Sequence, residues 1–481
     1  MSHWSTSPCL DEATAAQAEA VLRRSGMRLG DEVVGTVAAF DAEPAVLNYR
    51  ECFVRDFAVS AAAFLAVGET EVVRSFLLTV ARLRPDEAGS SIPPAAGLMP
   101  ASFTVERQAI DGRTREWVVA DYGQRAIGRV APVDSALWWL LILRAYQRAS
   151  GDTDFARTPE IGAAVERVLE FYLRPQFEML PSLLVPDGSS MIDRRMGVYG
   201  HPLDVQALFF AGLRAGQELL PEDHSLRLRV FDRLVALGRH LRQDYWLDRK
   251  RVEVIRRYPV EEFGTLQQNP WNLHPDAIPV WAMAWLAEGG GYFAGNLGPA
   301  RLDVRFFALG NLLAVSSGLA TPEHAEALFD LIERHLVDLV HETGMKLTYP
   351  PLEGRDWYTL TGSDQKNVPW SYHNAGTWPM LLWPLASAAR VVGRRALAAK
   401  AIEQSAPRLA RDCWPEYYDG PYGGFIGRRA RLNQTWTLAG VLAAAALLGD
   451  DDAPDPFAFE RDATLEAAIA AAEPDSVGRV G

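Results

Sequence analysis

Apolar residues recur at intervals of three and four residues along most of this chain, and that spacing constrains its fold more than any other feature. Residues at this spacing line one face of an α-helix, so the pattern predicts a chain built mainly of helices. Some segments, such as Leu137–Leu143, are apolar on every side, which is typical of a helix that is buried all round. We therefore predict an all-α fold. The predicted helices are Val54–Ala66, Glu71–Leu83, Ser135–Ala149, Ile161–Leu173, Leu203–Leu219, Leu226–Leu241, Thr321–Leu339, Trp378–Val392, Arg394–Arg408 and Leu432–Leu448.

Signals for strands and for domain boundaries are weak. Two short segments, Glu116–Ala120 and Arg251–Ile255, have strand character. No change in composition divides the chain, so we expect one domain over residues 1–449. Residues 450–481 are acidic and rich in Ala, Asp and Pro, and we expect a loosely attached tail there, in which Ala463–Ala472 could form a terminal helix.

The charge of the chain restricts its partners. A net charge of -13 argues against nucleic acid, because binding phosphates needs a basic surface, and it disfavours anionic membranes as well. A neutral small molecule is the partner that fits best. No apolar run is long enough to span a bilayer, and residues 1–20 lack the apolar core of a signal peptide.

Cysteines and short motifs give no sign of a cofactor. Cys9, Cys52 and Cys413 have neither metal-site spacing nor a disulfide pattern, so a reducing cytoplasmic location is expected. There is no phosphate-binding loop, no dinucleotide fingerprint and no Cys/His cluster in the sequence. We therefore predict neither a metal nor another cofactor.

Polar, aromatic stretches between the predicted helices are the candidate site loops. In Asn48–Phe57, Arg55 and Asp56 offer donors and acceptors for sugar hydroxyls, although an ion pair at a helix end explains this motif better when it is taken alone. Asp121–Asp134 fits a binding loop or a plain loop with a helix cap.

Met191–Pro202 combines an acid, two arginines, two glycines, a Tyr, a His and a Pro within twelve residues. Asp193 lies in this stretch without an obvious structural reason. Asp187 lies just before it, but the dipeptide Asp187-Gly188 is a natural turn, so a structural role explains Asp187 better.

Two further loops lie in the last third of the chain. Ser363–Pro379 is dense in Trp, Tyr, His and Asn, which favours a binding role. In Trp414–Gly420, Glu416 is surrounded by aromatic residues that can tune the pKa of a carboxyl group. Separated carboxylates, aromatic loops and a neutral substrate together favour glycoside hydrolysis, which needs one protonated and one ionised carboxyl group.

These five motifs, in their order from Asn48 to Trp436, closely resemble those of the alkaline and neutral invertases, glycoside hydrolase family 100. The stretches Gly291–Asn296 and Arg301–Gly310 also resemble that family. The resemblance implies an (α/α)6 barrel with additional inserted helices. It further implies hydrolysis of sucrose by attack at the glucosyl anomeric carbon, with inversion and without a metal.

Residue by residue, the resemblance implies a general acid, a general base and a set of sugar contacts. Asp193 corresponds to the acid and Glu416 to the base. Arg55 and Asp56 would hold glucose hydroxyls, and Arg431 would face fructose. The walls of the sugar site would be Trp370, Tyr372, His373 and Asn374.

The surroundings of the predicted acid create a tension. Asp193 must stay protonated near neutral pH, whereas the adjacent Arg194 and Arg195 would favour its charged form. We therefore predict that both guanidinium groups point away from Asp193 or pair with other carboxylates. If they do not, Asp187 becomes the better candidate for the acid.

Two other functions are consistent with the sequence. The chain could hydrolyse another neutral α-glucoside, such as trehalose, on the same fold, or it could bind sugars without catalysis. Large helical barrels often associate through their outer helices, so a homo-oligomer is also expected.

Overall fold

The computed structural model describes residues 8–40, 48–83, 97–110, 113–124, 131–174, 181–185, 188–192, 194–256, 269, 273–274, 277–286, 289–298, 301–450 and 454–472. Helices make up most of these residues, as the apolar spacing predicts. The helices are α1 (Glu12–Arg24), α2 (Val54–Ala66), α3 (Thr70–Arg82), α4 (Ser135–Ser150), α5 (Pro159–Tyr172), α6 (Leu203–Leu219), α7 (Leu226–His240), α8 (Arg249–Arg256), α9 (Val280–Trp285), α10 (Ala308–Ser316), α11 (Pro322–Arg334), α12 (Leu336–Leu339), α13 (Gly354–Thr361), α14 (Leu382–Val391), α15 (Arg395–Arg411), α16 (Thr435–Gly449) and α17 (Ala463–Ala471).

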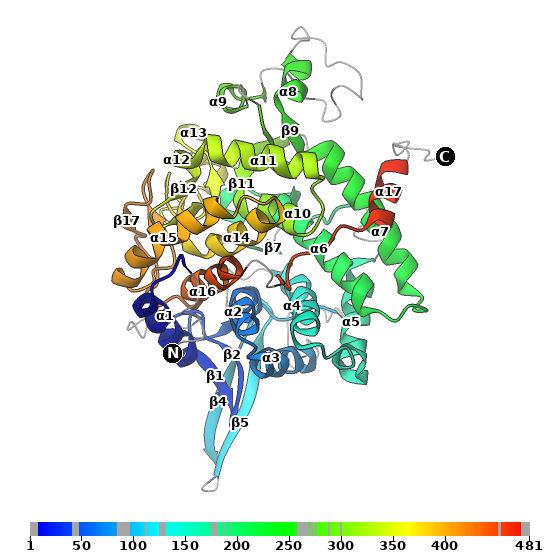
Figure 1. The fold of residues 1–481 in the computed structure, drawn as a ribbon, viewed down its shortest axis with the longest axis vertical. Coiled ribbons are helices and arrows are strands. Elements are labelled where there is room, and N and C mark those ends of the chain that lie inside the picture. Colours follow the sequence, from blue (N-terminus) through cyan, green and yellow to red (C-terminus); the bar gives the residue numbers. More distant parts are fainter. Residues whose placement is uncertain are drawn as a thin grey trace.

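Six of the described helices contact one another in a closed ring. In order around the ring they are α2, α4, α6, α10, α14 and α16, and α16 packs back against α2. Other helices pack against this ring: α3 lies against α2 and α4, α7 against α6, and α15 against α14 and α16. Figure 1 shows the ring helices at the centre of the molecule.

The composition of each helix explains its place. In α4 every residue from Ser135 to Tyr146 is buried, because the segment is apolar on all sides. In α3, by contrast, the buried residues Val73, Phe76, Leu77 and Val80 follow helical spacing on one face, which packs inward. Burial of apolar surface around the ring therefore decides which helices lie inside.

Two of the predicted helices, α2 and α6, begin and end at the predicted residues. The predicted strand at Arg251–Ile255 is wrong, because these residues belong to α8. Val252 and Ile255 are both buried and lie three residues apart, which is a helical spacing. An ion pair of 2.6 Å between Arg249 and Glu253, four residues apart, adds to the same helix.

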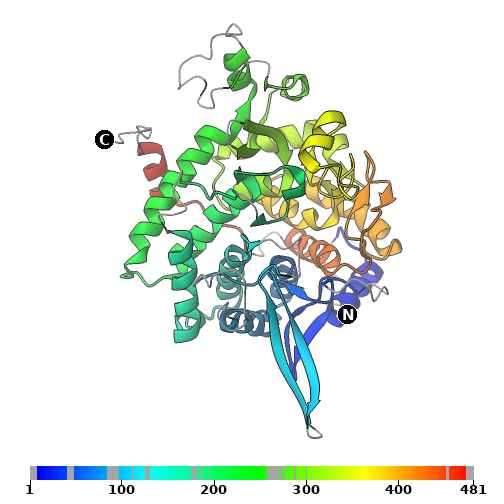
Figure 2. The same ribbon diagram turned by 180° about the vertical axis from the view of Figure 1, so that it is seen from behind.

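The predicted helical fold is confirmed in part, because the structure is mainly helical but also contains small sheets. The longest strands form the hairpin β4 (Ser102–Ile110) and β5 (Arg113–Asp121), which projects from the body in Figures 1 and 2 and contains the predicted strand Glu116–Ala120. The other strands are β1 (Gly26–Leu29), β2 (Glu32–Thr36), β3 (Cys52–Phe53), β6 (Ala131–Pro132), β7 (Gly188–Ser189), β8 (His201–Pro202), β9 (Trp246–Asp248), β10 (Gly291–Gly298), β11 (Arg301–Phe307), β12 (Val340–His341), β13 (Gly344–Lys346), β14 (Thr348–Tyr349), β15 (Thr377–Trp378), β16 (Tyr418–Asp419) and β17 (Phe425–Ile426).

Many of these strands lead directly into the ring. β3 is followed by α2, β8 by α6 and β11 by α10, while β6 ends shortly before α4. One sheet has the order β14-β11-β10-β8, and a second has the order β12-β13-β15-β16-β17. The sheets therefore gather loops at the amino ends of the ring helices.

The carboxy-terminal segment differs from the predicted loose tail. In its described part, 454–472, Phe459 is 6% exposed and packs under two guanidinium groups, with Arg144 at 3.6 Å and Arg214 at 4.7 Å from its ring centroid. Arg144 also donates to the carbonyls of Pro456 and Ala458, both at 3.1 Å. The segment ends in α17, which packs against α7.

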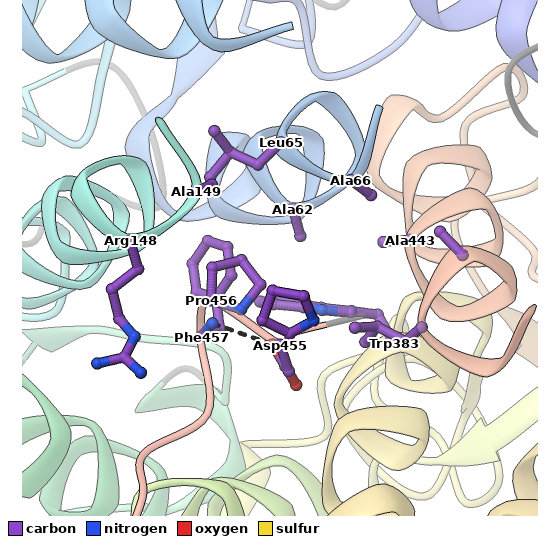
Figure 3. Close-up of a pocket in the computed structure, with 13 residues that line it drawn as sticks. Ala62, Leu65, Ala66, Arg148, Ala149, Trp383, Ala443, Asp455, Pro456 and Phe457 are labelled. Carbon is purple, nitrogen blue, oxygen red and sulfur yellow. Dashed lines mark hydrogen bonds between the residues drawn. The ribbon is translucent and has the colours of Figure 1, made fainter. Parts of the chain in front are cut away.

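A cavity of about 320 Å³ lies between this segment and the carboxy-terminal halves of α2 and α16. Figure 3 shows Phe457 and Pro456 on one side of it and Ala62 and Leu65 on the other. The lining is mostly apolar. No described helix has both the length and the apolar character needed to cross a membrane.

Candidate active site

The amino ends of neighbouring ring helices bring three carboxylates together around Arg55. Asp56 lies in the first turn of α2, Asp134 caps α4, and Asp204 lies in the first turn of α6. Arg55 donates to both oxygens of Asp134, from Nε at 2.5 Å and from Nη2 at 3.2 Å. Asp204 accepts a hydrogen bond of 2.8 Å from the N–H of Gly310, at the start of α10.

Burial changes the protonation of two of these carboxyl groups. It raises the pKa of Asp56 to about 7; Arg55 opposes this change, and the charges of Glu416 and Asp134 add to it. Burial also raises the pKa of Asp204 to about 7, against the hydrogen bond from Gly310. Both groups can therefore hold a proton near neutral pH.

Glu416 is 4% exposed and lies in the loop between α15 and β16. Tyr49 donates its hydroxyl proton to this carboxylate, with oxygen distances of 3.0 Å to Oε1 and 3.3 Å to Oε2. The main chain fixes the same residue, because the Glu416 N–H donates to the carbonyl of Arg431 at 2.8 Å. The carboxylate is thus held from two directions beside Asp56.

Tyr49 remains a hydrogen-bond donor over a wide pH range. Burial raises the pKa of its phenol well above the usual value, and the charge of Glu416 adds to this effect. The guanidinium of Arg431 lies 5.2 Å from the Tyr49 ring centroid. Tyr49 lies in the candidate motif Asn48–Phe57, but nothing in the sequence distinguishes it from its neighbours Asn48 and Arg50.

Tyr372 belongs to the same site. Its ring is stacked on His373 at 3.8 Å between centroids, and the ammonium of Lys366 lies 3.6 Å from its centroid. The pKa of Arg55 is lowered by burial but raised overall by Asp134, Asp56 and Tyr372. The Tyr372 hydroxyl is therefore close enough to the carboxylate cluster to influence its charges.

The remaining predicted wall residues have different surroundings. His373 is buried behind Tyr372, and Asn374 is fully buried. The Asn374 amide donates to the carbonyls of Leu352 at 2.9 Å and Asn367 at 3.1 Å, so its side chain shapes the loop. The ring centroid of Trp370 lies 5.2 Å from the Lys346 ammonium. The neighbours of Trp370 therefore differ from those of Glu416.

Asp193 and Asp187 lie outside the described residues, so the predicted acid is not located here. The residues before Asp193, Met191 and Ile192, are buried, and those after it form a 3-10 turn at Arg194–Met196. Of the two adjacent arginines, Arg195 lies 3.5 Å from Asp364 and so pairs with another carboxylate as predicted, whereas the side chain of Arg194 lies outside the described residues. The described residues contain no group of His, Cys, Asp and Glu side chains arranged to hold a metal ion.

Comparison with known proteins gives a family match over most of the chain. The family described as "Alkaline and neutral invertase" matches residues 18–451. The rice protein "Neutral/alkaline invertase 3, chloroplastic" is 45% identical over 94% of this chain and 77% of its own length. The rice protein "Cytosolic invertase 1" is 45% identical over 92% of this chain and 80% of its own.

Solved structures resemble the fold at low sequence identity. One titled "Glycosidase Wild Type" has a TM-score of 0.53 and 15% identity, covering 92% of this chain and 99% of its own. A GH63 mannosylglycerate hydrolase from Thermus thermophilus, in complex with glucose, has a TM-score of 0.54 and 14% identity over 89% of this chain and 99% of its own. These likenesses concern the fold alone.

Proposed function

Because this chain belongs to the alkaline and neutral invertases and is a glycoside hydrolase, we propose that it hydrolyses sucrose to glucose and fructose with inversion at the glucosyl anomeric carbon. The observation that carries this proposal is the buried carboxylate of Glu416, held by the Tyr49 hydroxyl at 3.0 Å beside the Arg55 cluster. A carboxylate fixed in this way is suited to take a proton from water. The net negative charge of the chain agrees with a neutral substrate.

In the proposed reaction Glu416 is the general base and Asp193 the general acid. Water attacks the glucosyl anomeric carbon while the bond from this carbon to the bridging oxygen breaks. Glu416 removes the proton of the water, and Asp193 donates its proton to the oxygen that leaves with fructose. After the reaction Glu416 carries a proton and Asp193 lacks one. Glu416 then releases its proton to solvent and Asp193 takes one up, which restores both groups before the next turnover.

The other side chains bind and orient the sugar. Asp56 and Tyr372 are residues of intermediate exposure; Asp56 interacts electrostatically with Glu416, and both Glu416 and Tyr372 interact with Tyr49. We assign Asp56 and Tyr372 to glucose hydroxyls. Arg55 fixes the cluster through Asp134 and keeps its predicted role as a sugar ligand. We give Arg431 the fructose side. His373 and Asn374 support Tyr372 from behind, and Trp370 would line the outer part of the site.

We assign the ring of α2, α4, α6, α10, α14 and α16, with the helices packed outside it, to an (α/α)6 barrel. The helices α8 and α9 would be additions to it. We also propose a cytoplasmic location, although relatives carry cytosolic, chloroplastic and mitochondrial names. A homo-oligomer is a further proposal.

The direct test is to follow the anomeric protons by NMR after mixing the protein with sucrose near neutral pH. Early appearance of β-glucose would support both the substrate and inversion. Early α-glucose would exclude inversion at glucose. If sucrose is not hydrolysed but trehalose is, trehalose would replace sucrose as the proposed substrate. Glu416→Gln and Asp193→Asn should each abolish turnover with the fold intact, and near-normal activity would remove that residue from the mechanism.

A further inference from the structure

Three polar side chains are buried together in the hairpin of β10 and β11. Asn296 on β10 is directly opposite Asp303 on β11, and Arg305, two residues further along β11, donates from its guanidinium to the Asp303 carboxylate. Asn296 and Arg305 are each 5% exposed and Asp303 is 8% exposed. Buried polar groups are costly unless they are paired, so this cluster needs an explanation.

An ion pair within the cluster holds its two charged members. Arg305 Nε donates to both oxygens of Asp303, at 2.9 and 3.1 Å, and Arg305 Nη2 donates to Oδ2 as well. Among the described residues, Arg305 Nη1 and Asn296 Oδ1 have no hydrogen-bond partner. Buried ion pairs of this kind are weak contributors to stability and are often replaceable by apolar residues. Stability alone is therefore a poor reason for this cluster.

Asn296 connects the cluster to the chain segment that carries the predicted acid. Its Nδ2 donates to the carbonyl of Tyr199 at 2.7 Å, and β10 pairs with His201 and Pro202 of β8. Tyr199 and the residues of β8 end the stretch Met191–Pro202, in which Asp193 lies. The amide of Asn296 thus fixes one end of that stretch to the sheet.

The same end of the stretch is closed tightly on its other side. Gly200 exchanges two main-chain hydrogen bonds with Val185, of 2.6 and 3.2 Å. Gly200 has a φ of +111°, and a Cβ there would lie 2.7 Å from both the Gly298 Cα and the Leu297 carbonyl oxygen. The carboxy-terminal end of the stretch is therefore tightly packed and has little freedom to move. Side-chain contacts to this end can set the position of the stretch.

We propose that Asn296, Asp303 and Arg305 are positioning residues for the general acid, acting through the anchored end of the Met191–Pro202 stretch. This inference rests on the proposed function, in which Asp193 is the acid. In this role the three residues act through the stretch and not on the substrate. The Asp303–Arg305 pair lies where the register of β10 and β11 shifts, opposite Asn296, and in this proposal it fixes that irregular pairing while Asn296 holds the stretch.

Two substrates with different leaving groups test this role. Sucrose needs a proton on its departing oxygen, whereas fluoride leaves α-D-glucosyl fluoride with little help from an acid. Misplacement of a catalytic group by about 1 Å can cost on the order of 100-fold in rate, so Asn296→Leu and Arg305→Met should lower kcat on sucrose by about 10- to 100-fold. The same variants should keep kcat on glucosyl fluoride within about threefold, because the base and the glucose site are intact.

Two controls make the result decisive. Asp193→Asn should show the same split between substrates; equal losses on both would refute Asp193 as the acid and thereby the proposed mechanism. Asn311→Leu is the matched structural control, because in the described part of the chain the Asn311 amide forms its hydrogen bonds with the main chain of Phe293 and Phe307. Asn311→Leu should change kcat on sucrose and kcat on glucosyl fluoride by similar factors.

The inference is overturned if Asp193→Asn separates the substrates while the Asn296 and Arg305 variants lower both rates equally or leave both unchanged. Thermal unfolding of each variant shows whether it is folded at the assay temperature. Should Asn296→Leu fail to fold, Asn296→Ser keeps a polar side chain that is too short to reach the Tyr199 carbonyl. The substrate ratio of that variant then decides the question.

Discussion

Removal of a single oxygen atom, in Tyr49→Phe, tests whether Glu416 is the catalytic base. The Tyr49 hydroxyl is 3.0 and 3.3 Å from the two carboxylate oxygens, and phenylalanine keeps the ring and its packing. The raised pKa of Tyr49 keeps the proton on its phenol throughout the pH range of the assay. The Tyr49 hydroxyl therefore donates to the carboxylate at every pH tested. The substitution therefore isolates that one interaction.

The expected loss follows from the strength of such a bond. A hydrogen bond to a charged group contributes about 1.5–3 kcal/mol, and the loss of one leaves the buried partner poorly satisfied. If this energy is lost mainly in the transition state, kcat falls by about 10- to 150-fold, at about 1.36 kcal/mol for each factor of ten. KM should change by less than about threefold, because the substrate-binding groups remain.

Initial rates on sucrose and on α-D-glucosyl fluoride provide the assay. A base is required for both substrates, so Tyr49→Phe should lower both rates by similar factors, unlike the variants at Asn296 and Arg305. Tyr422→Phe is the matched control, since Tyr422 is 68% exposed and should lose little activity. A loss of less than about threefold in kcat, with normal folding, would refute the assignment of the bond to catalysis.

Two further predictions concern stability. The pKa of Asp204 is raised to about 7 in the folded state, so the wild type should lose stability as the pH rises from about 4 through 7; Asp204→Asn keeps an acceptor for Gly310 and should lack this loss. The difference in Tm between Asp204→Asn and wild type should therefore grow over this pH range, and a constant difference would contradict the raised pKa. Phe459→Ala should lower the free energy of unfolding by about 3–5 kcal/mol, measured in urea, because a buried aromatic ring is removed. Phe425→Ala, at a residue 74% exposed, should change it by less than about 0.5 kcal/mol, and equal effects would contradict the packing of the carboxy-terminal segment.

The helices could be predicted from sequence because the ring buries whole helices. Periodicity gave both ends of α2 and α6. Strands such as β3 and β15, with two residues each, could not be found in this way. Alternation with a period of two needs at least about four residues to be distinguished from chance, and these strands are defined by partners far along the chain.

The carboxy-terminal segment shows a second limit of composition. Its acidic and proline-rich character predicts weak attachment to the rest of the chain. Phe457 and Phe459 are nevertheless buried and attach the segment by packing on the ring helices. Trp383 contacts Phe457 edge to face at 5.0 Å between centroids. A few apolar residues in a polar segment are enough to attach it when a matching surface exists, and that surface is visible only in the folded chain.

The candidate site could be predicted in part. Arg55, Asp56 and Tyr372 lie in polar motifs; in the folded chain Arg55 interacts electrostatically with Asp56 and Tyr372, and Asp56 interacts with Glu416. Asp204 was missed, because a lone Asp in the first turn of an apolar helix is explained by the helix dipole. Its role depends on Gly310, far along the chain, and closure of the ring is what places that N–H within 2.8 Å.

The ring also explains how a site for acid and base chemistry can work near neutral pH. Asp56 and Asp204 each lie in the first turn of a helix, where the dipole stabilises a negative charge. Burial and neighbouring carboxylates outweigh the dipole, and the pKa of both groups rises to about 7. Each dipole contributes about 0.3–1 kcal/mol, whereas the desolvation of a buried carboxylate costs several kcal/mol. The same burial that lets the site hold protons therefore lowers the stability of the folded chain above neutral pH, and the apolar ring around it must supply the difference.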